Sequence, residues 1–451
     1  YENTTGCYNF AVGPEALCGS LSGSYNFAVG QCALSENWGG CHNNGIGYFA
    51  LKNNTTGAEN TAIGQSAMVS NTTGGYNTAI GCRALCSNTE GDDNIVIGRG
   101  SFCKNTTGWE NIVLGREAMQ CSTTGNGNIA IGYHAANCST GNNTTAVGYN
   151  ALSHNCGGLG NTAIGRHAMR GTSGGHEGNY TTAIGYNAAD AGSAGYNVAI
   201  GNNAMCANTG GTYTIAIGHH AMAASSADSN VAIGGHVLCQ SSGSKNIGIG
   251  DEALKAHTSG IQNIAVGVVA LRYNTTGGYN TAAGTCSLYS NVSGDQNVAI
   301  GREALFNNKF ACYNVAIGNE ALRTTGCGDL ASGQGAKHNV AVGYQALAAN
   351  TIGYNNTGIG NKALCANTEG LVNTAVGDAA LCSNTTGDWN TAIGRESMKG
   401  STTGSYNVII GTESMTAANE GDNNVGVGTK VFAGNTDGAS NTSIGHHAGT
   451  Y

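Results

Sequence analysis

The residues of this chain that could carry out chemistry recur at a fixed spacing, and the cysteines show this most directly. Residues 77–108 read NTAIGCRALCSNTEGDDNIVIGRGSFCKNTTG, which is one pattern written twice, with Cys86 and Cys103 at matching places 17 residues apart. If the repeats stack, cysteines one repeat apart come within the span of a disulfide. We predict three such bonds: Cys86–Cys103, Cys121–Cys138 and Cys365–Cys382. The 17 cysteines include no zinc-like CxxC pairs, which favours disulfides in an oxidising compartment.

Carboxylates and histidines form a stripe along the repeats. We number each repeat from the glycine of its Asn-x-x-x-Gly element, called here the anchor glycine and position 0. Position +2 holds Glu15, Glu117, Glu252, Glu303, Glu320, Glu396 and Glu413, or His134, His167, His220, His236 and His447. A catalytic site needs a local cluster, and a column that accepts both charge signs is typical of a solvated face. We therefore predict no enzyme, no catalytic or metal-binding residue and no cofactor; the alternative is a metal held by His219–His220 or His446–His447 between chains.

Ten asparagines begin the Asn-x-Ser/Thr pattern that accepts N-linked sugar: Asn3, Asn54, Asn71, Asn105, Asn143, Asn179, Asn274, Asn291, Asn384 and Asn441. Two interpretations stay open for them. The segment NTTG is favourable turn chemistry and recurs for that reason alone, but an exposed turn in an oxidising compartment would also be a glycosylation site.

The composition excludes several classes of protein. The chain has 451 residues, of which 74 are glycine, one is proline and 10% are charged, with a net charge of −8. Without a Lys/Arg cluster, this charge argues against nucleic acid or an anionic membrane as the main partner. No apolar run approaches the ~18 residues that a membrane-spanning helix requires, so we predict no membrane insertion.

One repeat fills the whole chain. The anchor glycines run from Gly13 to Gly445 in 26 copies, mostly 17 and sometimes 16 residues apart, with wider gaps only before Gly185 and Gly343. A short fixed period of this kind indicates a solenoid. We predict a single repeat array over residues 1–451, with insertions near 170–178 and 324–338 bulging from it.

Each position of the repeat has its own residue preference. Position −1 is Ile, Val or Leu, position +3 is small, and position +4 is Leu or Met, so we expect these three columns to form the core. We predict an all-β parallel solenoid, or β-roll, of about 26 coils with two short strands per coil and coils ~4.8 Å apart. Stacked asparagines at position −4 should form an amide ladder, and the invariant anchor glycines should lie against neighbouring backbone. The copies that carry this prediction are Asn60, Asn77, Asn94 and Asn111 with Gly64, Gly81, Gly98 and Gly115.

The repeat NTAIG…AL…NTTG resembles the head repeat of trimeric autotransporter adhesins and the arrays of tail-fibre-like proteins of phages and large viruses. The strand element of that family matches residues 77–81 and their equivalents along essentially all of the chain. The resemblance implies a parallel β-roll, commonly three chains side by side, in an extracellular fibre or adhesin. We therefore expect a structural protein that associates end to end and as a lateral trimer. The alternative is an adhesin or virus tail-fibre shaft that binds a host surface or glycan.

Overall fold

The computed structural model describes residues 4–154, 157–171, 178–191, 194–208, 210–325, 335–417 and 420–450. The protein is an all-β parallel solenoid, and among the described residues there are 26 strands and no helix. The contacts divide the chain into two compact units, Tyr1–Ser226 and Ala227–Tyr451, which are described separately below. The predicted insertions near 170–178 and 324–338 lie mostly outside the described residues.

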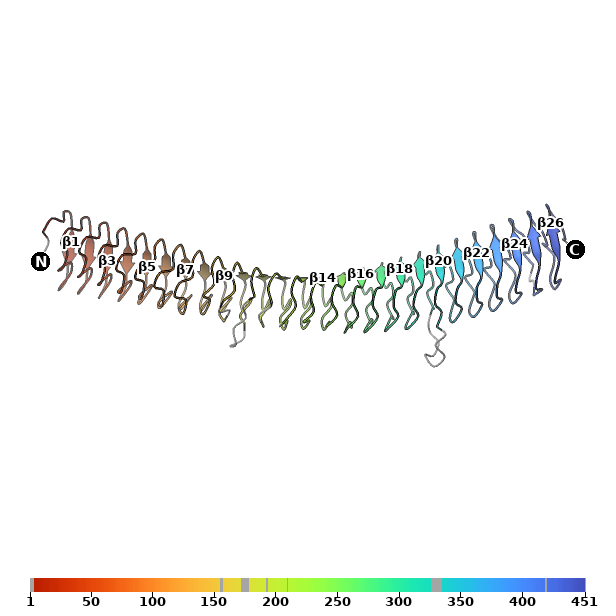
Figure 1. Cartoon of the computed structure of the whole chain (residues 1–451), viewed down its shortest axis with the longest axis horizontal. Coiled ribbons are helices and arrows are strands. Elements are labelled where there is room, and N and C mark those ends of the chain that lie inside the picture. Colours follow the sequence, from red (N-terminus) through yellow and green to blue (C-terminus); the bar gives the residue numbers. More distant parts are fainter. Residues whose placement is uncertain are drawn as a thin grey trace. The chain divides into compact units, whose positions relative to one another are not determined.

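Each unit contains thirteen strands of three residues, which follow one another in chain order (Figure 1). The first unit contains β1 (Phe10–Val12), β2 (Phe27–Val29), β3 (Asn44–Ile46), β4 (Thr61–Ile63), β5 (Thr78–Ile80), β6 (Ile95–Ile97), β7 (Ile112–Leu114), β8 (Ile129–Ile131), β9 (Thr145–Val147), β10 (Thr162–Ile164), β11 (Thr182–Ile184), β12 (Val198–Ile200) and β13 (Ile215–Ile217). The second contains β14 (Val231–Ile233), β15 (Ile247–Ile249), β16 (Ile264–Val266), β17 (Thr281–Ala283), β18 (Val298–Ile300), β19 (Val315–Ile317), β20 (Val340–Val342), β21 (Thr357–Ile359), β22 (Thr374–Val376), β23 (Thr391–Ile393), β24 (Val408–Ile410), β25 (Val425–Val427) and β26 (Thr442–Ile444). Within a unit each strand pairs in parallel with the next, equivalent residue on equivalent residue, as Ala62 does with Ala79.

Each coil has one strand, so the prediction of two strands per coil is wrong. The segment around Ala-Leu is a run of turns in which positions +2 and +4 are left-handed, as at Ser66 (φ 54) and Met68 (φ 49). In this conformation the N–H groups at positions +2 and +4 point toward opposite neighbouring coils. The Ser66 N–H donates to Tyr48 O at 2.8 Å in the preceding coil, and the Met68 N–H donates to Ala84 O at 3.0 Å in the next. Hydrogen bonds between coils therefore continue outside the strand and offset the cost of left-handed backbone.

The core is narrow and is filled from three columns. Position −2, usually Ala, and position +3 are small and buried, as Ala62 and Ala67 are, and position +4 supplies the bulk. All seven methionines occupy position +4 and are at most 1% exposed: Met68, Met119, Met169, Met205, Met222, Met398 and Met415. The prediction that position −1 belongs to the core is wrong. Successive residues of a strand point to opposite faces, so with Ala at −2 inside, the residues at −3 and −1 both face outward, and Ile63 is 37% exposed.

The anchor glycines leave no space for a side chain. Gly64 has φ +134, and a Cβ atom built there would lie 2.7 Å from the carbonyl of Gly81 in the next coil. The predicted asparagine ladder lies beside them at position −4, and Asn60, Asn77, Asn94 and Asn111 are fully buried. Asn77 accepts the Asn94 N–H at 3.0 Å and donates from Nδ2 to Asn60 Oδ1 at 3.1 Å. This ladder satisfies backbone and amide groups that the core would otherwise leave unpaired.

A second buried asparagine ladder runs along position +7, the first residue of NTTG. Asn71 Nδ2 donates to Asn54 Oδ1 at 2.7 Å and to Gly74 O at 2.8 Å. Glycine at position +10 is required by this ladder, because a Cβ on Gly74 would lie 2.7 Å from Asn71 Oδ1. The φ of Gly74 is not in the left-handed region, so close packing and not backbone conformation explains why the residue is glycine.

Candidate functional site

A stack of arginine and tyrosine side chains covers position +1 of five consecutive coils in the first unit. This first stack consists of Arg116, Tyr133, Tyr149, Arg166 and Tyr186. The Arg116 guanidinium lies 5.6 Å from the Tyr133 ring centre, and the rings of Tyr133 and Tyr149 stack at 5.3 Å. Arg166 lies over both Tyr149 (5.6 Å) and Tyr186 (5.8 Å). The parallel coils bring these residues together because they hold the same position in the repeat.

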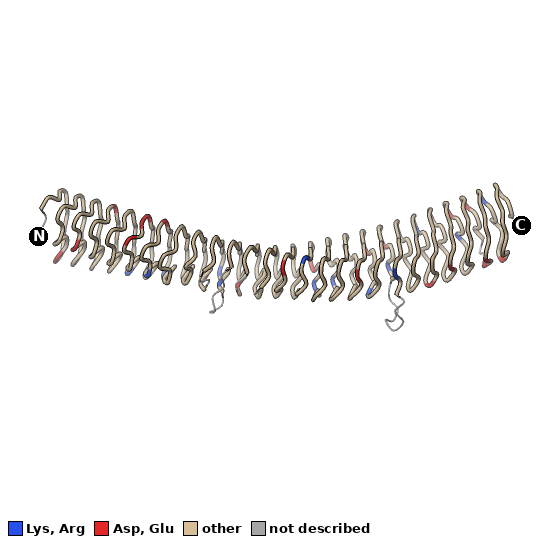
Figure 2. Tube along the Cα trace, viewed as in Figure 1, with Lys and Arg blue, Asp and Glu red and all other residues tan. Residues whose placement is uncertain are grey.

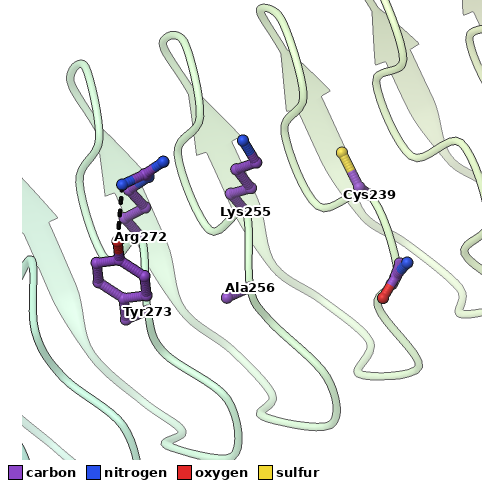
Figure 3. Close-up of a pocket in the computed structure, with 6 residues that line it drawn as sticks. Cys239, Lys255, Ala256, Arg272 and Tyr273 are labelled. Atoms are coloured by element: carbon purple, nitrogen blue, oxygen red, sulfur yellow. Dashed lines mark hydrogen bonds between the residues drawn. The ribbon is translucent and has the colours of Figure 1, made fainter.

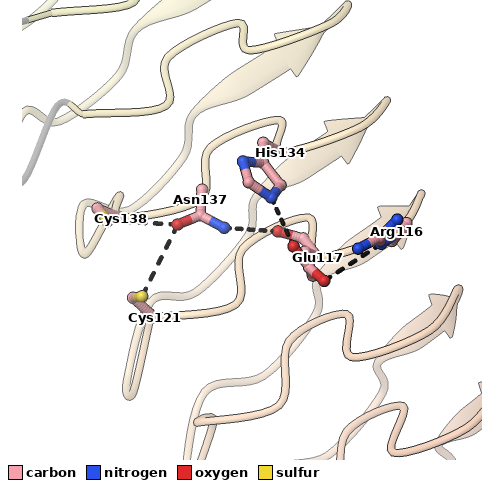
Figure 4. A network of polar contacts seen from close by, with 6 residues as sticks. All are labelled: Arg116, Glu117, Cys121, His134, Asn137 and Cys138. Carbon is pink, nitrogen blue, oxygen red and sulfur yellow. Dashed lines mark hydrogen bonds and ion pairs between the residues drawn. The ribbon is translucent and has the colours of Figure 1, made fainter.

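A small polar network adjoins the Arg116 end of the first stack (Figure 4). Glu117 accepts from Arg116 Nε at 3.2 Å and lies 2.6 Å from His134 Nε2, while its backbone carbonyl accepts from Asn137 Nδ2 at 2.7 Å. The hydrogen bond with His134, followed by those from Arg116, lowers the pKa of the Glu117 carboxyl. The +2 stripe is therefore half-buried and engaged in such contacts, in place of the freely solvated face that we expected.

The second unit contains a matching stack at position +5. This second stack consists of Arg272, Tyr289, Phe306 and Arg323, with the two rings 5.0 Å apart and nearly parallel. Both arginines reach carboxylates of the +2 stripe: Arg272 contacts Glu252 at 2.7 Å, and Arg323 contacts Glu303 at 2.9 Å. Arg272 also donates to the hydroxyl groups of Tyr273 and Tyr289.

A shallow pocket of about 290 Å³ lies beside the second stack, lined by Cys239, Gln240, Lys255, Ala256, Arg272 and Tyr273 (Figure 3). Lys255 and Arg272 bring two positive charges to it. Glu252 contacts both, at 2.5 Å and 2.7 Å, and the hydrogen bond from Lys255 is the main cause of its lowered pKa. The cations of this pocket are thus already partly neutralised.

The three cysteine pairs predicted to form disulfides differ in the contacts of their sulfur atoms. A disulfide joins Cys86 and Cys103, whose Cα atoms are 4.9 Å apart at position +5 of adjacent coils. The expected bond between Cys121 and Cys138 is not present, because both thiols lie against Asn137 Oδ1, at 3.7 and 3.4 Å, and that oxygen lies between them (Figure 4).

Cys365 and Cys382 hold the same position +5 as the bonded pair, but they are thiols in the structure. Cys365 Sγ donates to Cys382 O at 3.3 Å. The hydrogen bond between the two thiols raises the pKa of Cys365 and lowers that of Cys382 to about 6. The Cys365–Cys382 disulfide stays a prediction.

Most of the sequon asparagines are unsuited to carry sugar. Six of them belong to the +7 ladder and have no exposed surface: Asn54, Asn71, Asn105, Asn274, Asn291 and Asn384. Their Nδ2 atoms, which a glycan would occupy, all donate to a glycine carbonyl, and five of them also donate to the asparagine of the preceding coil. The expectation of sugar at these six residues does not fit the structure. Asn143 and Asn441 are exposed and Asn179 is partly so, whereas Asn3 lies outside the described residues.

The predicted histidine pairs form edge-to-face ring contacts, with centres 4.2 Å apart in both His219–His220 and His446–His447. Among the described residues, no three His, Cys, Asp or Glu side chains are close enough together to hold a metal ion. In the same part of the chain, no helix is long and apolar enough to cross a membrane.

Neither the two stacks nor the second ladder was predicted from the sequence. Each had a signal: Arg and aromatic residues recur at one position of consecutive repeats in the stacks, and Asn recurs at +7 in 14 copies, against 23 copies at −4. Comparison of the chain with models of known protein families found no match, and comparison with curated proteins found none either. The function must therefore be argued from the surface itself.

Proposed function

We propose that this chain is a structural protein that forms a rigid extracellular fibre and has no catalytic activity. The proposal rests on the types of residue that the strands present on their outer face. Positions −3 and −1 carry no charged residue in any of the 26 strands, and their Ile side chains stay well exposed, as Ile97 and Ile131 do at 38% each. Position −1 is aliphatic in every one of these strands, and an exposed, uncharged face with a continuous aliphatic column is typical of an association surface.

A second copy of the chain fits this face better than an unrelated protein does. The exposed residues recur with every coil, and another solenoid presents the same recurrence, so that side chains can interdigitate along the whole contact. If each coil offers on the order of 100 Å² here, the thirteen coils of one unit exceed the ~800 Å² per partner of a stable interface. The lateral trimer that the family resemblance implies would use this face, and end-to-end association would lengthen the fibre. The disulfide Cys86–Cys103 supports an oxidising, extracellular location.

Sedimentation and negative-stain electron microscopy of the purified chain test this proposal. We expect particles with more than one chain per cross-section at micromolar concentration. The double variant Ile97→Lys with Ile131→Lys should sediment as a single chain, because two charges on each copy oppose burial of the face. Gln65→Lys, at an exposed position +1, is the matched control and should assemble like the wild type. Single chains at micromolar concentration in the wild type would contradict the proposal.

A second candidate function, a surface that binds a host glycan, is favoured by the first stack. Its aromatic and guanidinium groups are exposed on the outside of the coils, with Tyr149 46% and Tyr186 42% exposed. These residue types are enriched where proteins recognise ligands.

A further inference from the structure

We propose that the first stack binds an acidic polysaccharide, with the Arg166 guanidinium as the main contact to a uronate carboxylate. This inference rests on the second candidate function, surface binding, and is independent of fibre assembly. It follows from three features of the stack: the way in which Arg166 is held, the spacing of the positive charges, and the exposure of the tyrosines.

Within the described residues, the hydrogen-bond donors of Arg166 have no partner. The guanidinium carbon of Arg166 lies over two rings, 5.6 Å from the centre of Tyr149 and 5.8 Å from the centre of Tyr186, so the guanidinium is placed between two tyrosines. The residue is exposed, and among the described residues no carboxylate forms an ion pair with it. A planar guanidinium fixed in this way loses little freedom when it binds, and its fork of donors matches the two oxygens of a carboxylate.

The positive charges of the surface are widely spaced. Arg99 and Arg116 precede Arg166 at position +1. With coils ~4.8 Å apart, Arg99 and Arg116 lie ~5 Å from each other, and they lie four and three coils, or ~19 and ~14 Å, from Arg166. A DNA duplex presents a charge every ~1.7 Å and needs a dense array of cations, which this chain, at a net charge of −8, does not offer. A sugar polymer with one carboxylate per one or two residues has a charge density closer to that of the stack.

The exposed parts of the tyrosines suit a sugar chain between its charges. The ring edges of Tyr149 and Tyr186 offer apolar surface, and their hydroxyl groups can donate to or accept from sugar hydroxyls. The stack runs over five consecutive coils on an open surface, so an extended polymer can contact all of it.

The second stack provides a matched control within the same molecule. Arg323 lies 5.5 Å from the Phe306 ring and so is stacked like Arg166, but Glu303 already contacts its Nε at 2.9 Å. A uronate would have to displace that carboxylate. The inference therefore predicts that only the arginine without an acidic partner contributes to polysaccharide binding.

The test is biolayer interferometry of the full chain on immobilised polygalacturonate, with dextran as the neutral polymer and single-stranded DNA as the dense polyanion. We expect binding to polygalacturonate that weakens with added salt, and at least tenfold weaker binding to dextran and to DNA. Arg166→Gln should lower the affinity about tenfold, and Arg166→Lys should lower it nearly as much, because a lysine keeps the charge but loses the fork and the stacking. Arg323→Gln should change it less than twofold.

Several outcomes would overturn the inference. Equal losses for Arg166→Gln and Arg323→Gln would show that binding depends on charge alone. Equal or tighter binding of single-stranded DNA would identify a general polyanion surface, and equal binding of dextran would remove the role of the carboxylate. Circular dichroism of each variant shows whether the fold is kept. Because assembly is measured separately by sedimentation, failure of this inference leaves the fibre proposal standing, and failure of the fibre proposal leaves this inference standing.

Discussion

The two stacks contain the same kinds of side chain in the two units, and they differ in the groups around their arginines. In the first stack, Arg166 is exposed between two tyrosines without a carboxylate partner among the described residues. In the second stack, Arg272 and Arg323 both contact glutamates. The charged residues are few along either unit, as Figure 2 shows. In the first stack Arg116 also contacts a carboxylate, that of Glu117, so among the described residues Arg166 is the arginine of the two stacks that lacks an acidic partner.

The same contrast appears at two other positions of the repeat. Position +5 carries the disulfide Cys86–Cys103 in the first unit and the thiols Cys365 and Cys382 in the second. Position +7 carries a run of five asparagines from Asn37 to Asn105 in the first unit, whereas in the second unit Ser241 and His257 precede a run of three, Asn274 to Asn308. These differences leave the backbone unchanged, because the buried positions −2, +3 and +4 and the anchor glycine maintain it. Outward-facing chemistry can therefore vary from coil to coil at little structural cost.

The prediction with the largest expected effect concerns the core. It tests whether a buried charge at position +4 destabilises both units to the same extent. Leu85 and Leu364 both hold position +4 and have no exposed surface. Replacing either with Asp buries a carboxylate without a partner, which should destabilise the surrounding coils by about 4 kcal/mol. Hydrogen exchange of backbone amides in the flanking coils measures this. The control Gln65→Asp, at an exposed position, should change the protection of these amides by less than about 0.5 kcal/mol. A large loss of protection for only one of the two leucine variants would contradict the prediction.

The cysteine pairs should differ in a way that depends on reducing agent. A disulfide closing a 17-residue loop stabilises by about 3 kcal/mol, so Cys103→Ser should lose about that much unfolding free energy without reductant. With reductant present throughout, Cys103→Ser and Cys382→Ser should both cost less than about 1 kcal/mol. Denaturant unfolding in the two conditions measures the difference. A loss of about 3 kcal/mol for Cys103→Ser in reductant would show that the bond is not its source.

His257 should make the second unit sensitive to acid. Its Nδ1 lies 2.9 Å from Ser241 Oγ, and burial lowers its pKa from 6.5 to about 4. Below pH 6.5 the unfolded chain takes up a proton that the folded chain refuses, so stability falls as the pH drops toward 4. Between pH 7 and pH 4.5 this loss amounts to about 2.5 kcal/mol.

The variant His257→Asn removes this titration and continues the ladder. The difference in unfolding free energy between variant and wild type should therefore grow by about 2.5 kcal/mol from pH 7 to pH 4.5, since all other titrating groups are common to both. Denaturant titrations at the two pH values provide the measurement. A difference that does not change with pH would mean that His257 has the same pKa in the folded and in the unfolded chain.

The smallest effect concerns Glu303, which contacts both Arg302 and Arg323. Glu303→Gln should change the unfolding free energy by less than about 0.5 kcal/mol, because these ion pairs are partly exposed. The substitution should also remove the carboxylate partner of Arg323, so that this arginine, like Arg166, can bind a uronate. We expect about twofold tighter binding to polygalacturonate, measured by interferometry. Weaker binding would show that the glutamate is not what separates the two stacks.

Much of the fold follows from the repeat alone, and the errors have a common cause. The period, the parallel stacking and the close contact at the anchor glycines could all be predicted from invariant spacing. The outward position of Ile63 could not be predicted by ranking residues by hydrophobicity, because the small Ala62 at −2 is buried and the larger Ile63 is not. Strand alternation held the missing information: Thr61 and Ile63 must share a face, so the polar Thr already indicated the outside.

The candidate site was harder to foresee. A sequence shows that Arg166 and Tyr186 hold the same position of consecutive repeats, but not which side chains turn along the axis and stack. The burial of Asn54 and Asn71 could not be predicted for a related reason. An asparagine in an exposed turn and one in a buried ladder have the same neighbours in the sequence. In both cases the deciding partner lies one coil away.

The contact between each anchor glycine and the next has a consequence for how such a chain evolves. Because every coil presents to its successor the same surface that its predecessor presents to it, duplication of a 17-residue stretch of the gene inserts a coil that fits on both sides. The length of the molecule can thus change by unequal recombination without any compensating substitution. Coils of 16 residues, such as the one between Gly132 and Gly148, show that a single-residue deletion in the turn is also tolerated. Selection can act on length in small, nearly neutral steps while the recognition chemistry of each coil diverges independently.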